Sequence, residues 1–257
     1  MAPAPLDLRS WSERAGLEGV RDVRAITTGR SGSAVASVRT STGTVVVKVT
    51  TDPGQLARAR REVAVLGHLA GHPVPLAPTV RGTVVGADGV AVALEQAAPL
   101  PPAGRLSAGD WQAIAALVAA VHLAPAPPGL SEVPGASGLP LVLAHGDCHL
   151  DNMVRDGSGR VLLVDWQDAR RGDGLDDLVF AWQRAEFEGA HPPREEMTAT
   201  YAAARGLDGA ALAPLLDAAE LRLLRENWPP FLAMGDESGR TVLARRLAAL
   251  TSAGREA

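Results

Sequence analysis

Lysine is almost absent from this sequence of 257 residues, in which the single Lys48 stands beside 24 arginines. Aromatic residues make up only 4%, while Ala, Gly, Pro and Arg are abundant. Such a composition is typical of a GC-rich genome, whose mutational bias replaces dispensable lysines by arginine. A surviving lysine is either an accident or has a task for which a compact ammonium is suited and a planar guanidinium is not.

Other absences exclude whole classes of protein. One cysteine, Cys148, permits neither an internal disulfide nor a cysteine-rich zinc module. No apolar run reaches the roughly 18 residues of a membrane span, and the first residues lack the basic and apolar regions of a signal peptide. The net charge of −4 argues against nucleic acid and favours a neutral or cationic small substrate. We expect a cytoplasmic globular protein without a membrane partner, and the sequence leaves its oligomeric state open.

The first half of the chain has the pattern of a β-sheet. Strands are predicted at 23–27, 34–40 and 44–50, with turns at 29–33 and 41–43. Alternation in the third strand places Val46 and Lys48 on one face, and the other face carries Val45, Val47 and Val49.

A helical pattern follows this strand. Asp52 and Pro53 predict its N-cap and first position, and the apolar residues that follow recur at helical spacing. Glu62 lies three residues after Ala59 and four before Leu66, on the buried face of this helix. A carboxylate in that position needs a partner.

A change in composition after residue 97 predicts two lobes. A hairpin at 79–95 ends near Glu95, Gln96 and Ala97, and a proline-rich segment follows. Beyond it, the pattern predicts a helix at 108–123 and further helices from about 173. We therefore predict an α+β fold, with a small antiparallel β-rich lobe at 1–97 and a larger, mainly helical lobe at 98–257.

The most informative segment lies in the second lobe. Apolar runs at 153–155 and 161–164 flank the turn at 156–159, which predicts a β-hairpin. Asn152 precedes this hairpin and Asp165 follows it, so that the two side chains lie on adjacent strand ends about 5 Å apart. With Asp147 five residues upstream, these oxygen atoms are hard ligands suited to Mg²⁺.

The stretch His145-Gly-Asp-Cys-His-Leu-Asp-Asn152 resembles the catalytic loop of the aminoglycoside phosphotransferase family, which consists of small-molecule kinases with a protein-kinase-like fold. The resemblance continues through Asp165-Trp-Gln, Gly172-Asp173 and Asp177-Leu178. It covers about residues 24–180, and upstream it includes Lys48, Glu62 and the turn at 29–33. Six elements in the correct order are specific, although one alone would be weak.

The resemblance implies a role for each of these residues. Lys48 contacts the α- and β-phosphates of ATP and is held by Glu62, while Asp147 accepts or orients the proton of the acceptor hydroxyl. Mg²⁺ is bound by Asn152 and Asp165. Asp177 is expected to be structural and to bond the catalytic loop.

Further residues complete the implied nucleotide site. The backbone of the turn formed by Gly29, Ser31, Gly32 and Ser33 would surround the phosphates. Glu95, Gln96 and Ala97 would form the hinge that binds adenine through backbone atoms. GTP in place of ATP remains possible from the sequence.

The acceptor implied by the resemblance is a small molecule with a hydroxyl group, with an aminoglycoside-type antibiotic first and other antibiotics or metabolites as alternatives. The expected function is therefore phosphoryl transfer in antibiotic resistance. Acidic residues that suit a polyamine sugar occur beyond residue 180, at Glu186, Glu188, Glu195, Glu196, Asp217, Glu220, Glu226, Asp236 and Glu237.

Three other interpretations use the same residues. His145, Asp147 and His149 alternate as ligands of a metallohydrolase would, and Cys148 beside a histidine could be a thiol nucleophile. A pseudokinase that only binds nucleotide is the third. The metallohydrolase leaves Lys48 without a role.

Overall fold

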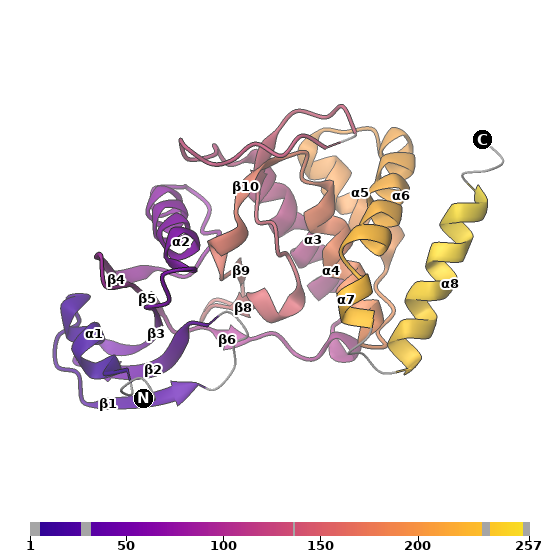
Figure 1. Cartoon of the computed structure of the whole chain (residues 1–257). Helices are drawn as coiled ribbons and strands as arrows, with labels where there is room; N and C mark the ends of the chain where they lie inside the picture. The colour runs from indigo at the N-terminus through magenta and orange to yellow at the C-terminus, as the bar shows by residue number, and fades with distance from the viewer. Residues whose placement is uncertain (1–5, 27–31, 136, 233–236, 254–257) are drawn as a thin grey trace.

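The computed structural model describes residues 6–26, 32–135, 137–232 and 237–253, which form a sheet-rich part and a larger helical part (Figure 1). This arrangement confirms the predicted α+β fold with two lobes. Within these segments, every helix is too short or too polar to span a bilayer.

The N-terminal part is an antiparallel sheet of five strands in the order β1-β2-β3-β5-β4. The strands are β1 (Asp22–Ile26), β2 (Ala34–Thr40), β3 (Gly43–Thr50), β4 (Val80–Val85) and β5 (Val90–Glu95). Helix α1 (Leu8–Arg14) packs on one face through Trp11, and α2 (Leu56–Leu69) lies on the other, with Leu66 and Leu69 near Val92 and Leu94. The sheet is therefore covered by one helix on each side.

The alternation predicted for β3 is confirmed. Val45, Val47 and Val49 are buried in the cluster under α1. Lys48 is partly buried and points to the opposite face, toward α2. The strand thus gives one face to the apolar core and the other to the site.

The predicted start of α2 is wrong by three residues. The helix begins at Leu56 after Gln55, and Asp52 belongs to the preceding turn. The side-chain Oδ1 of Asp52 accepts a hydrogen bond from the backbone N–H of Gly54 at 2.9 Å. An aspartate that bonds the backbone two residues ahead stabilises a turn, and Gly54 is a poor residue for a first helical turn.

A short strand absent from the sequence interpretation joins the two parts. β6 (Ala98–Pro99) pairs with β8 (Met153–Arg155), which pairs with β9 (Val161–Leu163). The predicted hairpin at 153–164 is therefore confirmed. The proline-rich segment is anchored to it and continues through the 3₁₀ turn η1 (Ala103–Arg105).

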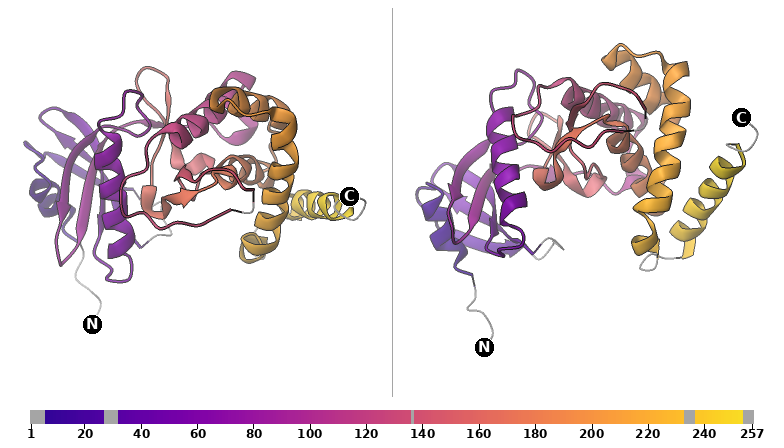
Figure 2. Two further views of the ribbon diagram at one scale, coloured as in Figure 1. Left: turned by 90° about the horizontal axis from the view of Figure 1, so that it is seen from above. Right: turned by 45° about the horizontal axis from the view of Figure 1, so that its top comes forward.

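The helices of the larger part lie on the side of this hairpin that faces away from the five-stranded sheet (Figure 2). Its first helix, α3 (Ala108–Leu123), has the predicted bounds and begins with a capping box formed by Ser107 and Asp110. Strands β7 (Val142–Ala144) and β10 (Arg170–Gly172) form a two-stranded sheet. The remaining elements are the 3₁₀ turns η2 (Leu150–Asn152) and η3 (Trp166–Asp168) and the helices α4 (Leu175–Phe187), α5 (Arg194–Arg205), α6 (Gly209–Glu226), α7 (Pro229–Leu232) and α8 (Glu237–Ala253).

Candidate active site

Lys48 and Glu62 form a buried ion pair between β3 and α2. The Nζ atom of Lys48 lies 2.9 Å from Oε2 of Glu62, whose side chain is 3% exposed. The buried carboxylate expected from the helical pattern therefore has its partner.

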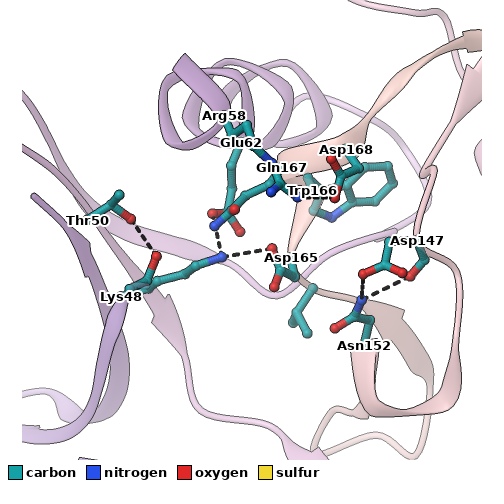
Figure 3. Close-up of polar contacts among 12 residues, drawn as sticks. Lys48, Thr50, Arg58, Glu62, Asp147, Asn152, Asp165, Trp166, Gln167 and Asp168 are labelled. Carbon is teal, nitrogen blue, oxygen red and sulfur yellow. Dashed lines mark hydrogen bonds and ion pairs between the residues drawn. The ribbon is translucent and has the colours of Figure 1, made fainter. Parts of the chain in front are cut away.

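A second carboxylate reaches the same lysine from the other part of the molecule. Asp165 follows β9, and its Oδ1 lies 2.8 Å from Nζ of Lys48 (Figure 3). Burial opposes the charge of Lys48, but Glu62 and Asp165 outweigh it and raise the pKa of the ammonium. Lys48 is thus held as a cation at the junction of the two parts.

Asp165 has an unusual backbone conformation. Its φ of 64° makes it the one non-glycine with positive φ among the described residues. Asp tolerates the left-handed region better than most residues, and such conformations concentrate at functional sites. The next residue, Trp166, is fully buried and donates its indole N–H to the carbonyl of Leu163 at 3.1 Å, which fixes the chain that carries Asp165.

Asn152 lies beside Asp165 at the base of the hairpin, as predicted. The backbone N–H of Val164 donates to the carbonyl of Asn152 at 2.9 Å, which extends the pairing of β8 and β9 by one step. The Nδ2 atom of Asn152 donates to the backbone carbonyl of Asp147 at 2.9 Å and to its Oδ2 at 3.1 Å. The amide oxygen of Asn152 is thereby turned away from Asp147, toward the side of Asp165 (Figure 3).

The carboxylate of Asp147 is partly exposed, at 38% of its side chain. Nε2 of His149 lies 3.5 Å from its Oδ2. Burial opposes ionisation of Asp147, but His149, His145 and Asn152 together lower its pKa. Asp147 is therefore an ionised, accessible acceptor held in a defined orientation.

The backbone before Asp147 is fixed by Asp177 at the start of α4. Oδ2 of Asp177 accepts from the N–H of His145 at 2.6 Å, and Oδ1 accepts from that of Gly146 at 2.9 Å. The structural role expected for Asp177 is confirmed. Gly146 has a φ of 84°, and a Cβ atom there would lie 2.3 Å from the carbonyl oxygen of Asp168, so only glycine fits.

Asn152 and Asp165 provide a donor set that fits Mg²⁺. An amide oxygen and a carboxylate are hard ligands, which this ion prefers. The excess of carboxylate over cation around Lys48 also favours an added positive charge.

The proposed phosphate-binding turn is only partly described. Gly29 and Ser31 lie outside the described residues. Gly32 has a φ of 69°, and the hydroxyl of Ser33 lies 2.7 Å from that of Thr50 at the end of β3. The hydroxyl pair joins the end of this turn to the strand of Lys48.

The proposed adenine hinge lies between β5 and β6. Glu95 forms an ion pair with Arg81 at 3.0 Å, so its side chain is turned toward β4. The N–H of Gln96 donates to the carbonyl of Thr44 over 3.4 Å, and Ala97 is partly buried. The role of these three residues stays a prediction.

The metallohydrolase and thiol interpretations are not supported by the geometry. Both ring nitrogens of His145 bond backbone, since Nδ1 accepts from Asp147 N–H at 3.3 Å and Nε2 donates to the carbonyl of Val164 at 2.9 Å. No group of three His, Cys, Asp or Glu in the described segments could hold a metal. Cys148 is buried, and burial raises the pKa of its thiol well above its usual value.

Two arginines of α2 were missed at the sequence level. Arg58 forms an ion pair with Asp168 (Figure 3). Arg61 donates to the carbonyl of Gln167 at 2.8 Å. The signal available in the sequence was that Arg58 precedes Glu62 by four residues and so shares its face of the helix. These contacts fix α2 against η3, the segment that follows Asp165.

The acidic residues expected to receive a polycationic acceptor are largely occupied. Most of those that are described pair with arginines, among them Glu186 with Arg194, Glu188 with Arg184 and Asp217 with Arg246. Glu220 is fully buried and cannot line a cleft. Asp236 lies outside the described residues.

Comparisons with known proteins agree with this geometry. Residues 90–215 match a family model described as the phosphotransferase enzyme family, APH. No curated protein matches the chain. The predicted resemblance to the aminoglycoside phosphotransferase family is thereby confirmed.

Solved structures share the fold over nearly the whole chain. Macrolide 2'-phosphotransferase MphH from Brachybacterium faecium has a TM-score of 0.67 at 20% identity and covers 94% of this chain and 98% of its own. A thermostable mutant of aminoglycoside phosphotransferase APH(4)-Ia, in ternary complex with ADP and hygromycin B, has a TM-score of 0.62 at 16% identity, with 96% and 98% covered. A microcompartment-associated aminopropanol kinase has a TM-score of 0.63 at 20% identity, with 97% of both chains covered.

Proposed function

We propose that this small-molecule kinase transfers the γ-phosphoryl group of ATP to a hydroxyl group of an antibiotic, with Asp147 as the group that receives or orients the hydroxyl proton. The observation that carries the proposal is the convergence of Lys48, Asp147, Asn152 and Asp165 from both parts of the chain. In phosphoryl transfer the protein contributes mainly positioning and charge neutralisation.

The residues divide the work between binding and proton transfer. Lys48, oriented by Glu62, would neutralise charge on the α- and β-phosphates. Asn152 and Asp165 would hold Mg²⁺, which would supply positive charge that neutralises the charge developing on the phosphates. Asp147 would receive the acceptor hydroxyl on the exposed side of its carboxylate.

The nucleotide would lie between the two lobes, for which we propose the bounds 1–97 and 98–257. The turn Gly29–Ser33 and the backbone of Glu95–Ala97 would contact its phosphates and its base. A structural neighbour binds ADP, which supports a nucleotide at this place. The acceptor would then approach Asp147 from the helical lobe.

The acceptor class rests on the neighbours, whose names point to a macrolide, hygromycin B and an aminopropanol. We propose an antibiotic, with an aminoglycoside first, and a role in resistance. The arginine partners of the acidic residues support an acceptor with less positive charge as the alternative. A neutral antibiotic or an amino alcohol would meet that condition.

The test is a nucleotide-consumption assay with ATP and GTP across aminoglycosides, macrolides, amino alcohols and sugars. Asp147→Asn should reduce phosphoryl transfer by about 10²–10⁴-fold and leave nucleotide affinity within a few-fold. Asp156→Asn is the matched control, since Asp156 lies in the exposed hairpin turn and its acceptor oxygen is preserved.

Two outcomes would contradict the proposal. Intact transfer in Asp147→Asn would remove Asp147 from the chemistry. Binding of ATP without consumption with any acceptor would favour a pseudokinase.

A further inference from the structure

We propose that His122 and Tyr201 are positioning residues, which form a buried hydrogen-bond relay from the surface of α5 to the catalytic loop. The inference deepens the proposed function, because the loop it fixes carries Asp147. His122 is the penultimate residue of α3, and Tyr201 lies on α5, 79 residues away.

The direction of every bond in the relay follows from its ends. Nη1 of Arg205 lies 2.6 Å from the hydroxyl oxygen of Tyr201 and can only donate to it. At the other end, the carboxylate of Asp177 can only accept, so Nε2 of His122 carries the ring proton and donates to Oδ2 of Asp177, at 3.2 Å. With the proton on Nε2, Nδ1 is the acceptor for the hydroxyl hydrogen of Tyr201, at 2.8 Å.

The relay ends on the backbone that precedes Asp147. Asp177 accepts the N–H groups of His145 and Gly146 in addition to the bond from His122. Each oxygen of Asp177 thus accepts a hydrogen bond from the backbone of the loop, and Oδ2 also accepts the hydrogen bond from Nε2 of His122. The position of this carboxylate sets the position of two peptide groups next to the reacting side chain.

The relay is enclosed in the core, where its bonds have no competition from water. The side chains of His122 and Asp177 are 0% and 1% exposed, and Tyr201 is fully buried. A buried polar group that loses its partner destabilises the fold, so apolar residues of similar size would be the simpler filling. That His122, Asp177 and Tyr201 are nevertheless polar indicates that the orientation of the Asp177 carboxylate is important.

Three further observations support fixed orientation. A Cβ atom on Gly174, at the start of α4, would lie 2.7 Å from the His122 ring, so the ring is in tight contact with the helix that carries Asp177. Burial raises the pKa of Tyr201 to about 12, so its hydroxyl keeps the proton that it donates. Burial opposes the charge of Asp177, but the hydrogen bond from His122 leads the interactions that lower its pKa.

The test removes one hydroxyl and keeps the ring. Tyr201→Phe should increase amide hydrogen exchange in the peptide 143–149 by at least about threefold, because loss of one hydrogen bond loosens the carboxylate that holds this backbone. Phosphate release from Mg·ATP, with water or an acceptor from the panel, should fall by about 3- to 10-fold in kcat while KM for ATP stays within about twofold.

The matched control lies on the same helix. Met197 is fully buried in the core and has no part in the relay. Met197→Ala should lower the melting temperature more than Tyr201→Phe does, with unchanged exchange in 143–149 and unchanged kcat per folded molecule. His122→Leu should reduce kcat at least as much as Tyr201→Phe, and the double variant should be no worse than His122→Leu alone.

Several results would overturn the relay. These are equal exchange in Tyr201→Phe and Met197→Ala, faster exchange without a fall in kcat, or single effects that multiply in the double variant. Hydrogen exchange needs no substrate, so it decides the question even if the wild-type protein transfers no phosphate. That last result would count against the proposed function alone.

Discussion

Two glutamates are almost completely buried among the described residues, and they are neutralised in opposite ways. Glu62 shares one cation, Lys48, with a second carboxylate, Asp165. Glu220 on α6 receives two cations, Arg194 from α5 and Arg246 from α8, at 2.8 Å each. The first glutamate shares a single cation with a carboxylate from the other part of the molecule, whereas the second is contacted by two cations within the helical part.

The difference indicates which group is built for a ligand. Around Glu62, two carboxylates share one ammonium, and one of them, Asp165, is partly exposed, so that a ligand can reach it. Around Glu220, the arginines also pair with Glu186 and Asp217, so that four helices are joined in one network. We interpret the first as a functional site and the second as a structural one.

The largest effect should come from removal of the metal. Excess EDTA should reduce phosphoryl transfer by more than roughly 10²-fold, since metal stabilisation of the transition state is worth several kcal/mol. The melting temperature without nucleotide should stay unchanged, because the network around Glu220 needs no ion. Restoration of activity by added Mg²⁺ completes the measurement. Full activity in EDTA would contradict the metal-binding role of Asn152 and Asp165.

Glu220→Ala should act on stability instead. We expect a loss of about 3 kcal/mol in the free energy of unfolding, at the low end for a broken buried ion pair because both arginines keep some contact with water. Chemical denaturation measures it, with kcat per folded molecule as the second reading.

The control for Glu220 is its neighbour Asp217, which pairs with the same Arg246 but is 57% exposed. Asp217→Ala should cost less than about 1 kcal/mol. Equal losses of unfolding free energy in the two variants would mean that burial does not make the ion pairs of Glu220 more important for stability than that of Asp217.

Lys48→Arg should lower kcat/KM by at least about tenfold, or roughly 1.4 kcal/mol. The charge is conserved, but the wider guanidinium must displace the phosphates, Glu62 or Asp165. Steady-state kinetics and a melting curve separate this loss from unfolding. Arg60→Lys, on the exposed face of α2, should leave both unchanged. Normal kinetics in a folded Lys48→Arg protein would make the single lysine an accident of composition.

The smallest effect concerns salt and the acceptor. Residues 98–257 contain 21 of the 29 acidic residues but 14 of the 25 basic ones. Because many of these acids are paired, KM for a polycationic acceptor should rise by less than about threefold between low salt and roughly 0.2 M. A neutral acceptor should show no trend. Salt-independent turnover of a neutral alcohol would support the kinase activity but exclude an aminoglycoside as its acceptor.

The parts of the site that sequence reasoning reached are those with a local pattern. Alternation in a strand placed Lys48, helical spacing placed Glu62, and a hairpin signature brought Asn152 next to Asp165. These periods are properties of single elements, and a hairpin joins neighbours in the chain.

The parts that it did not reach depend on contacts between distant elements. The bond between His122 and Tyr201 spans 79 residues, and no spacing rule relates α3 to α5. Glu220 was interpreted as a candidate acceptor residue because its arginine partners lie on other helices. Asp52 was assigned to a helix because a turn and a cap use the same side-chain chemistry.

The position of Lys48 has a consequence for chemical labelling. As the single lysine of this sequence, it is the only side chain with a primary amine, so an acylating reagent has one side-chain target. Acylation needs the neutral amine, and the two carboxylates that raise its pKa should make the reaction slow in the free protein. A mass shift on the peptide 44–50, and its suppression by nucleotide, would therefore report directly on nucleotide binding beside Lys48.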